Sequence, residues 1–495
     1  MKYAYLSLVL VLVLACGSSA EKVEMRPVDP ILPPYLVEYD SSWVDSVYLS
    51  LSFREKLGQL FMPYVYSNKG QSHIDKQLKM IQKYPVGGFI WMQGTPRKQM
   101  QYYNQLQDAS KVPLMFSIDA ERGLAMRLDS THQFPYQMTM GALANDSLVY
   151  EVGKMIAEHC RKVGAHINFG PVVDVNNNPR NPIINIRSFG ARRENVAQKG
   201  IAYMKGMQDE RVLACAKHFP GHGDTEQDSH LTLPKLNFDS SRMDSLELFP
   251  FKKMIDSGVG SIMAAHLHIP IYDSTADKAA SLSQNVIGQL LRKDLKFKGI
   301  SFTDALNMKG VSKYYKPGAV ELEALKAGND VLLFSENIPE AFKVIEQALL
   351  DSVIDSSVVE AKALKILKLK SWLKIEDTLR AFSDSLFDYS AAQELNDEVF
   401  SNAPFVLRNS SSIDSLELYQ ITCKSKYARK NFGFSIAELD KIKGAIDSTK
   451  LLVIYGSPFA ANLFPEVANI AIAFKKTSAS KKSVMQRSFL GNNPL

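Results

Sequence analysis

The sequence is poor in cysteine and has no dense cluster of basic residues. Its four cysteines, in 495 residues, lie far apart at Cys16, Cys160, Cys215 and Cys423. This spacing indicates neither a disulfide framework nor a Cys-x-x-Cys metal site, so we expect Cys160 and Cys215 to be small buried residues. The formal net charge is only +6, with lysine and arginine spread along the chain. We therefore predict no nucleic-acid partner.

Apolar runs of membrane-spanning length are also lacking, and the one conspicuous apolar run lies at the start. Lys2 precedes residues 6–14, which are almost entirely apolar, and residues 13–16 (Val-Leu-Ala-Cys) resemble a bacterial lipobox. The run is too short for an ordinary spanning helix. We predict a lipoprotein signal peptide over residues 1–15 and Cys16 as the lipidated first residue of an exported, membrane-anchored bacterial lipoprotein, on the periplasmic or cell-surface side. The alternative is an ordinary cleaved signal with an incidental cysteine.

A proline-rich segment follows the predicted anchor. Residues 21–42 contain four prolines, a composition typical of an extended spacer, so we predict a tether over residues 16–42. Ser52 and Glu55 then match a capping box, in which the two side chains satisfy each other's backbone N–H groups at a helix start. We expect the globular part to begin near residue 43.

From residue 43 to residue 376, apolar runs alternate with helical patterns. The eight candidate strands are residues 59–65, 88–92, 114–119, 167–173, 212–216, 261–266, 299–303 and 330–334. Such alternation is typical of a parallel α/β sheet, and eight strands with interleaved helices favour a (β/α)8 barrel of the TIM type. Polar residues close several of these strands, where a barrel assembles its site from distant positions.

Residues 217–230 (KHFPGHGDTEQDSH) follow the fifth candidate strand and are dense in titratable groups. Three histidines, two aspartates and a glutamate in this stretch are poorly suited to a core. In one interpretation, Asp228 and His230 form a proton-transfer pair, because a carboxylate can orient an imidazole that titrates near neutral pH. In another, the three histidines bind a metal together with Asp224 or Asp228. The third interpretation is a solvated polar loop.

The same stretch resembles the signature loop of the family 3 glycoside hydrolases that act as β-N-acetylglucosaminidases, in which K-H-F-P-G-H-G-x-x-x-x-D-S-H carries an acid/base dyad. Residues 169–190 (FGPVVDVNNNPRNPIINIRSFG) resemble the family's sugar-binding segment, and residues 301–307 (SFTDALN) resemble its nucleophile strand. All three stretches occur in the family's order within residues 45–375. The intact Asp-x-His pair favours the N-acetylglucosaminidase branch, because other branches such as β-glucosidases generally take the acid/base from elsewhere.

The resemblance implies a role for each polar residue and needs neither a cofactor nor a metal. Asp304 would be the nucleophile, His230 the acid/base, and Asp228 the carboxylate that holds the His230 ring. The residues that would hydrogen-bond the terminal N-acetylglucosamine are Asp119, Arg187, Lys217 and His218. Without the motif, Asp304 would equally fit a helix N-cap, Arg187 a surface salt bridge and Lys217 a solvated lysine.

The metal interpretation has one further candidate outside the signature loop. His266-Leu267-His268 has the H-x-H form found in barrel metallohydrolases. That pair typically lies on the first strand, which here reads GQLFMPYV and has no histidine, so we predict no catalytic metal. We expect His222 and Asp224 to shape the loop and His266 to line the pocket, whereas His268 fits a core position equally well.

These features together predict a retaining exo-β-N-acetylglucosaminidase that works through a covalent glycosyl–Asp304 intermediate. The implied partner is a glycan ending in β-linked N-acetylglucosamine, with peptidoglycan fragments as the expected natural class. One alternative is a family 3 enzyme of the β-glucosidase or xylosidase type, and another is a glycan-binding lipoprotein without turnover. The residues leave open whether water or phosphate resolves the intermediate.

The remainder of the chain, residues 377–495, is expected to form part of a second α/β domain. Strand-like runs occur at residues 405–408, 451–455 and 469–474. The resemblance leads us to expect further strands beyond residue 495. We therefore predict an incomplete second domain whose sheet has an open edge.

Overall fold

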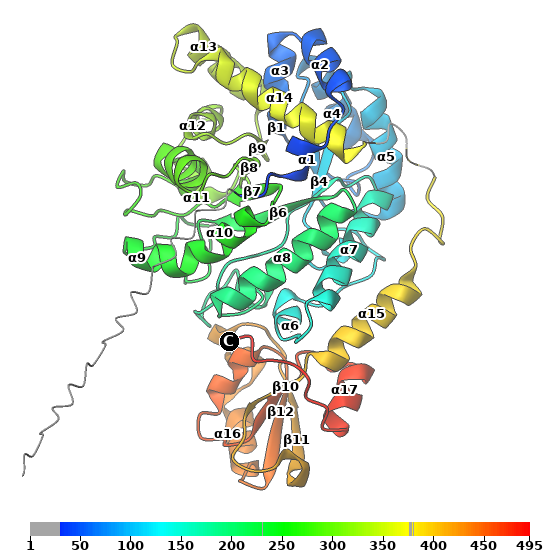
Figure 1. Cartoon of the computed structure of the whole chain (residues 1–495), viewed down its shortest axis with the longest axis vertical. Helices are drawn as coiled ribbons and strands as arrows, with labels where there is room; N and C mark the ends of the chain where they lie inside the picture. The colour runs from blue at the N-terminus through cyan, green and yellow to red at the C-terminus, as the bar shows by residue number, and fades with distance from the viewer. Residues whose placement is uncertain (1–29, 230, 376–378, 380) are drawn as a thin grey trace, which may run out of the picture.

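The computed structural model describes residues 30–229, 231–375, 379 and 381–495, and it has two lobes (Figure 1). The predicted signal peptide, Cys16 and His230 lie outside the described residues. In the ranges just given, no helix is both long and apolar enough to cross a membrane. The larger lobe ends near residue 375, and the smaller lobe is built from residues 405–489. Helix α15 (Tyr389–Asn402) connects them.

Each of the eight predicted strand segments overlaps a strand of the larger lobe, although the fifth strand runs to Phe219, three residues beyond its predicted end. The strands are β1 (Phe61–Met62), β2 (Tyr64–Val65), β3 (Gly88–Trp91), β4 (Met115–Ile118), β5 (Ile167–Asn168), β6 (Leu213–Phe219), β7 (Ser261–Ala264), β8 (Ile300–Thr303) and β9 (Leu332–Leu333). Strands β2 to β8 form one seven-stranded sheet in chain order, and β1 pairs with β9. All of these pairings are parallel. The predicted barrel is confirmed.

The first barrel strand differs from the prediction because it is divided in two. Pro63 separates β1 from β2, and proline has no N–H to donate to a sheet ladder. The ring still closes on this side, since Leu332 N–H donates to Leu60 O at 2.8 Å and Thr303 N–H to Val331 O at 3.1 Å. Parallel strands buried on both faces require apolar sequence throughout, which accounts for the continuous apolar runs.

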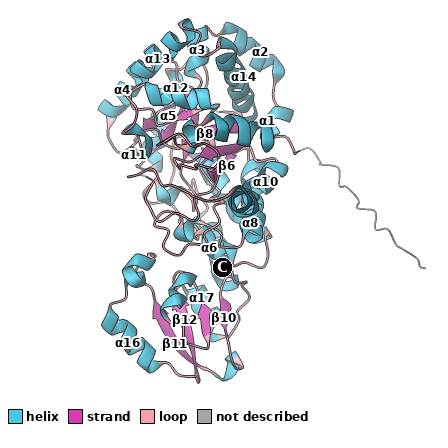
Figure 2. Ribbon diagram, turned by 90° about the vertical axis from the view of Figure 1, so that its left-hand side faces the viewer, coloured by secondary structure: helices cyan, strands magenta, loops and turns pink. Residues whose placement is uncertain are grey.

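Helices cover the outside of the barrel strands (Figure 2). The longer ones are α4 (Gln71–Lys83), α5 (Pro96–Asp108), α7 (Ser147–Lys162), α8 (Arg193–Asp209), α10 (Leu248–Asp256), α12 (Ala319–Ala327), α13 (Ile338–Leu350) and α14 (Ser356–Leu373). Helices α7 and α8 approach closely at Gly153 and Gly206. A Cβ at Gly206 would lie 2.2 Å from Tyr150 O, and one at Gly153 would lie 2.4 Å from Tyr203 O. Only glycine permits this packing, which fixes the helices that flank β5 and β6.

The predicted tether over residues 16–42 is wrong for its last part. Residues 34–37 form α1 and residues 41–50 form α2, both packed against α14. Tyr35 is fully buried, and its hydroxyl donates to Gly260 O at 2.9 Å. Burial of one large aromatic side chain outweighs the extended preference of the surrounding prolines. The predicted capping box at Ser52 is confirmed at the start of α3 (Phe53–Gly58).

The smaller lobe is a four-stranded sheet with helices beside it (Figure 2). Its strands are β10 (Phe405–Arg408), β11 (Glu417–Thr422), β12 (Lys450–Tyr455) and β13 (Ile470–Ile472), in the order β10-β13-β12-β11. Strand β10 is antiparallel to β13, whereas the other pairs are parallel. The three predicted strand-like runs each contain a strand. Strand β11 was not predicted, because only Ile421 of its six residues is buried and the apolar signal is weak.

The last five residues run back between the two lobes and contact both (Figure 1). Gly491 N–H donates to Pro404 O at 2.9 Å, and Asn492 N–H donates to Ala142 O at 2.6 Å. Pro494 O accepts the N–H of Ala191 at 2.9 Å. Gly190 has a φ of +146°, and a Cβ there would lie 2.1 Å from Pro494 O. The tail therefore packs directly on the loop that follows Arg187.

Candidate active site

A cavity of about 570 Å³ opens at the carboxyl ends of the barrel strands. The polar residues that line it are Asp119, Glu121, Arg127, Arg187, Lys217, His218, His222, Ser229, Asp304, Asn307 and Lys309. They come from segments that follow β4, β5 and β8 and from β6 and the loop after it. In a parallel barrel, the carboxyl ends of all strands meet at one face. The prediction that Asp119, Arg187, Lys217, His218 and Asp304 converge on one site is confirmed.

Lys217 joins two carboxylates on one wall of the cavity. Its Nζ lies 3.1 Å from Asp119 Oδ1 and 2.9 Å from Glu121 Oε1, and its side chain is 3% exposed. Arg127 also pairs with Asp119. Burial would lower the pKa of Lys217, but the two carboxylates outweigh it and raise that pKa above its ordinary value. The ammonium is therefore a fixed positive charge.

Arg187 completes this wall through a two-pronged contact with Glu121. Its Nε donates to Oε2 at 3.0 Å and its Nη2 to Oε1 at 2.6 Å, the geometry that makes arginine–carboxylate pairs strong and directional. Burial opposes ionisation of Glu121, yet Arg187 and Lys217 hold its pKa well below its ordinary value. The buried carboxylate of Glu121 therefore fixes the orientation of Arg187, the predicted sugar-binding arginine. Arg187 does not lie in a surface salt bridge.

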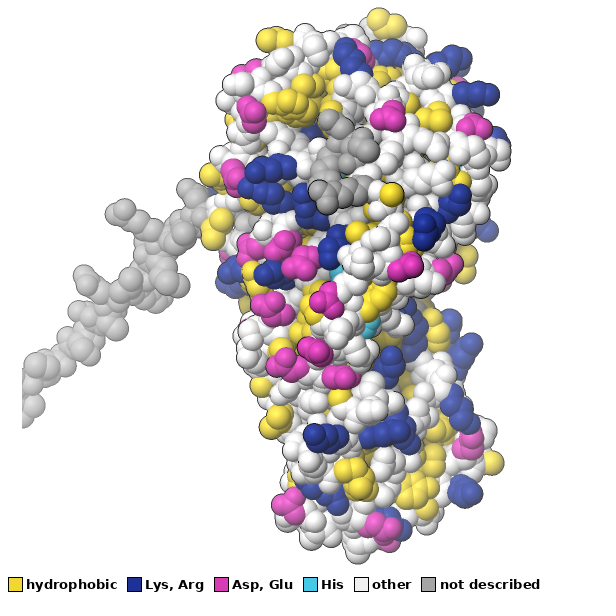
Figure 3. Space-filling model, turned by 90° about the vertical axis from the view of Figure 1, so that its right-hand side faces the viewer, with side chains coloured by type: hydrophobic (Ala, Val, Ile, Leu, Met, Phe, Trp, Pro, Cys, Tyr) yellow, Lys and Arg dark blue, Asp and Glu magenta, His cyan; other side chains and the backbone are white. Residues whose placement is uncertain are grey.

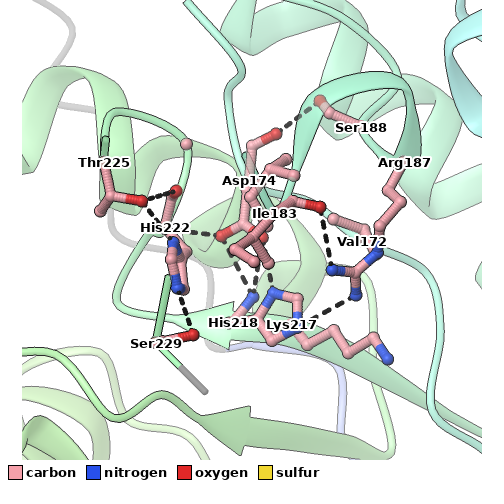
Figure 4. Close-up of polar contacts among 12 residues, drawn as sticks. Val172, Asp174, Ile183, Arg187, Ser188, Lys217, His218, His222, Thr225 and Ser229 are labelled. Carbon is pink, nitrogen blue, oxygen red and sulfur yellow. Dashed lines mark hydrogen bonds and ion pairs between the residues drawn. The ribbon is translucent and has the colours of Figure 1, made fainter. Parts of the chain in front are cut away.

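Asp174 does not line the cavity, but it organises the start of the signature loop (Figure 4). Its Oδ2 accepts from His218 Nδ1 at 2.7 Å, and its Oδ1 accepts from the backbone N–H of His222 at 2.7 Å. Arg187 Nη2 lies 3.4 Å from His218 Nε2. Since arginine remains protonated, it donates to that nitrogen. His218 therefore carries its proton on Nδ1 and accepts at Nε2.

His222 holds the loop that leads to the predicted dyad. Its Nε2 lies 2.9 Å from Ser229 Oγ and its Nδ1 lies 2.9 Å from Thr225 Oγ1 (Figure 4). Burial lowers the pKa of His222 to about 4, so this ring is neutral at physiological pH. The prediction that His222 shapes the loop is confirmed. Asp224 does so as well, through an ion pair with Arg242 at 3.0 Å.

The predicted dyad is described only in part. Asp228 is partly buried, and its backbone carbonyl accepts the N–H groups of Leu231 and Thr232, each at 3.0 Å. His230 lies outside the described residues, so its role stays a prediction. Ser229, one residue before it, is 3% exposed and lines the cavity. The chain is therefore fixed at the cavity wall up to the residue that precedes His230.

Asp304 follows β8 directly, as predicted, and its side chain lines the cavity. Its backbone N–H donates to Ala264 O of β7 at 2.9 Å, and its Oδ1 accepts the N–H of Ala305 at 2.8 Å. The next helix, α11 (Lys309–Ser312), has Met308 at its N-cap. Asp304 is therefore not a helix N-cap, and its carboxylate is fixed at the rim by its own strand.

His266 and His268 make different contacts. His266 was expected to line the pocket, but it is fully buried behind it, with Nε2 at 3.0 Å from Ala305 O and Nδ1 at 2.7 Å from Ser281 Oγ. It supports the turn that carries Asp304. His268 Nδ1 lies 3.2 Å from Lys278 O, in keeping with a satisfied, buried histidine. In the ranges described, no three His, Cys, Asp or Glu side chains are grouped so as to hold a metal ion.

Sequence reasoning missed three residues of this site: Glu121, Arg127 and Asp174. Glu121 lies two residues after Asp119 in the same polar run, and that spacing was the available signal. Asp174 lies inside the segment 169–190 that was linked to sugar binding, but the polar asparagines around it offered no reason to select it. Its importance depends on contacts with residues 44 and 48 positions later.

Comparison with known proteins assigns the chain to a family. The model of the glycosyl hydrolase family 3 N-terminal domain matches residues 52–369. Beta-hexosaminidase A of Pseudoalteromonas piscicida is 30% identical over 384 residues, covering 71% of this chain and 64% of the relative. A beta-N-acetylglucosaminidase/beta-glucosidase of Cellulomonas fimi is 28% identical over 357 residues, covering 70% of this chain and 62% of the relative. The chain belongs to glycoside hydrolase family 3.

These alignments span less than two thirds of the two relatives' own lengths. A solved structure matches more completely. The family 3 beta-N-acetylglucosaminidase of Paenibacillus sp. str. FPU-7 has a TM-score of 0.72 and 27% identity, covering 90% of this chain and 98% of that chain. Both lobes therefore have counterparts in a solved member of the family.

Proposed function

We propose that this protein is a retaining exo-β-N-acetylglucosaminidase. One observation carries the proposal: Asp304 shares a single cavity with the paired charges of Asp119, Glu121, Lys217 and Arg187. A nucleophilic carboxylate beside a wall of aligned donors and acceptors suits a sugar ring, whose hydroxyls need both. The names of the relatives from Pseudoalteromonas and Paenibacillus support the acetamido sugar as the substrate.

The reaction takes place in two steps. Asp304 attacks the anomeric carbon while the His230 imidazolium gives its proton to the leaving oxygen, so that a glycosyl–aspartate ester forms and the aglycone departs as an alcohol. His230, now neutral, then takes a proton from water as that water attacks the same carbon and releases Asp304. Asp228 orients the imidazole and stabilises its charged form in both steps.

The fixed charges on the cavity wall position the sugar for this chemistry. Because Glu121 and Asp119 already neutralise Arg187 and Lys217, these side chains bind hydroxyls without leaving an unpaired buried charge. His218 adds a ring to the same wall whose orientation is fixed, because its Nδ1 contacts Asp174 and its Nε2 contacts Arg187. Rigid placement matters, since a nucleophile has to lie near 3 to 3.5 Å from the carbon that it attacks.

A second candidate activity is that of a β-glucosidase, because the Cellulomonas relative carries both names. The test compares aryl β-N-acetylglucosaminide with aryl β-glucoside, using wild type and Asp304→Ala. We expect preference for the acetamido sugar and loss of turnover in the variant. A slow substrate should leave a glycosyl adduct that peptide mapping locates on Asp304. Activity that survives in Asp304→Ala would mean that the nucleophile is another residue, and preference for the glucoside would favour the second candidate.

The cellular setting belongs to the same proposal. The lipobox-like residues 13–16 support acylation of Cys16 and export, and peptidoglycan fragments ending in N-acetylglucosamine are the natural substrates that fit such a location. Membrane fractionation of wild type and Cys16→Ser tests the anchor. Release of the variant into the soluble fraction is expected, whereas unchanged membrane association would remove the support for acylation.

A further inference from the structure

A second cavity, of about 340 Å³, lies between the two lobes, and we call it the interlobe pocket. Residues 133–136, 138 and 139, together with Ile186 of the larger lobe, line one side. The smaller lobe contributes residues 423–426 and 456–457, with Phe474 and Lys475, and Phe400 of α15 adds an apolar side chain. Figure 3 shows the waist between the lobes, with Lys and Arg side chains on both sides of it.

The charge of the interlobe pocket is of one sign. Its lining residues include Lys424, Lys426 and Lys475 and no aspartate or glutamate. Lys424 is paired with Glu438 at the surface. Across the part of the chain that the structure describes, Lys426 has no ion pair, and its Nζ packs over the rings of Tyr136 and Tyr427 at 5.7 and 5.4 Å. The pocket therefore holds positive charge that these side chains leave uncompensated.

Two further observations concern hydrogen-bond donors in or beside the pocket that have no acceptor. Ser457 is only 4% exposed, yet its hydroxyl has no hydrogen-bond partner in the described residues. Arg122 packs over Tyr136 at 4.8 Å, and its buried Nη1 is also without a partner. Buried donors are nearly always satisfied in folded proteins. A lining hydroxyl and a neighbouring guanidinium that both lack an acceptor indicate that a ligand supplies one.

The direction of the pKa shift of Lys426 also favours a bound anion. Burial and the nearby Arg187 and Arg122 lower its pKa from the ordinary value, and only Glu121 opposes them. An ammonium among other cations is stabilised by a bound anion. The two cavities are neighbours, because Arg187 and Glu121 line the active-site cavity while Ile186, next to Arg187, lines the interlobe pocket.

We propose that the interlobe pocket binds an oxyanion carried by the leaving half of the glycoside, with Lys426 and Ser457 as its contacts. The assignment rests on the proposed function and narrows the substrate class to glycosides whose aglycone bears a carboxylate or a phosphate group. Phe400, Phe474 and Met138 give the pocket apolar walls as well, which suits an anion attached to a larger body. Free inorganic phosphate has the same chemistry and is the other source that the test distinguishes.

The experiment uses the full chain and two aryl β-N-acetylglucosaminides that differ only in a carboxylate or a carboxamide on the aryl ring. We expect wild type to prefer the carboxylate in kcat/KM by about tenfold at low salt. Lys426→Gln should reduce that ratio to below about twofold, and Ser457→Ala should reduce it in part. Lys441→Gln, which removes an exposed lysine of the same lobe outside the pocket, should leave the ratio unchanged.

Inorganic phosphate at constant ionic strength forms the second arm. If free phosphate is the ligand, it alters turnover of the carboxamide in wild type and not in Lys426→Gln, and no carboxylate preference is seen. Equal handling of both substrates with no phosphate effect dependent on Lys426 would overturn the assignment. If neither substrate is turned over, the proposed function fails separately. Calorimetric titration of phosphate then tests the pocket, and equal binding by wild type and Lys426→Gln overturns it.

Discussion

One oxygen of the Asp174 carboxylate accepts the backbone N–H of His222 at 2.7 Å. The other oxygen accepts from the ring of His218 at the same distance. A single fully buried side chain therefore fixes the imidazole that we propose binds the sugar and the start of the loop that leads to His230. The proposed acid/base thus follows a loop whose start is held by a residue that does not itself line the cavity.

Replacing Asp174 should impair catalysis although this residue does not line the active-site cavity. In Asp174→Asn, one amide oxygen remains as an acceptor but the NH2 group faces a donor, so either His218 or His222 is released. We expect kcat/KM for an aryl β-N-acetylglucosaminide to fall about a hundredfold and residues 222–230 to become more sensitive to protease. Glu226→Gln, at a carboxylate of the same loop whose side chain is 51% exposed, is the control. Wild-type activity in Asp174→Asn would contradict the positioning role.

Glu121 and Arg187 should act as a unit. Removal of Glu121 leaves the Arg187 guanidinium without its carboxylate, and removal of Arg187 leaves Glu121 with Lys217 alone. Removal of both leaves Lys217 paired with Asp119. Activation free energies from kcat/KM of Glu121→Gln, Arg187→Gln and the double variant should give a coupling energy of about 0.5 to 3 kcal/mol. The exposed pair Arg54 and Glu346 provides the reference cycle, with a coupling near zero. Additive losses at Glu121 and Arg187 would show that they contribute independently.

The acid role of His230 predicts a dependence on the leaving group. An aryl oxide with a low pKa departs without protonation, whereas an alkyl alcohol needs a proton in the first step. His230→Ala should therefore lower kcat/KM for a poor leaving group by about 10² to 10⁴ and for a good one by much less. Asp228→Asn should show the same trend with smaller losses. Equal losses on both substrates would assign the acid to another group.

Much of this site was predictable because the ends of the strands can be recognised from the sequence. The residues that close strands three, five and seven of the predicted series reach the cavity, since side chains at carboxyl ends of parallel strands share one face. Asp174 and Glu121 were not predictable in this way, because their role depends on contacts with residues that are distant in the sequence. The misplaced tether has a similar origin: the burial of Tyr35 depends on a groove formed by residues more than 200 positions later.

The stability of the larger lobe should depend on pH through Lys370. This side chain is 2% exposed on α14, and its Nζ donates to Gln59 Oε1 at 2.6 Å. Burial lowers the pKa of Lys370 to about 7 from an ordinary value of 10.5. The unfolded chain therefore binds more protons between these values, so this group makes stability rise with pH from about 7 to about 10.5. Below pH 7 the buried ammonium of Lys370 lowers the free energy of unfolding by its full amount.

Lys370→Met should remove that contribution. The variant should gain stability over wild type at pH 7 and lose this advantage by about 1.4 kcal/mol for each pH unit toward 10. Denaturant unfolding at pH 7 and pH 9 measures the difference. Lys343→Met, at a lysine whose side chain is 76% exposed, controls for loss of a surface charge. A constant difference between Lys370→Met and wild type at both pH values would show that Lys370 titrates normally.

Residues 491–495 also restrict how the two lobes of this chain could be exchanged for those of a relative. Their backbone bonds to Ala142 and Ala191 of one lobe and to Pro404 beside the other, and Gly190 is shaped to receive them. A smaller lobe taken from a relative would keep these bonds only if the chain that follows it also fitted Ala142 and residues 188–191 of this larger lobe. Exchange of one lobe alone is therefore expected to cost the bonds that residues 491–494 make between the lobes.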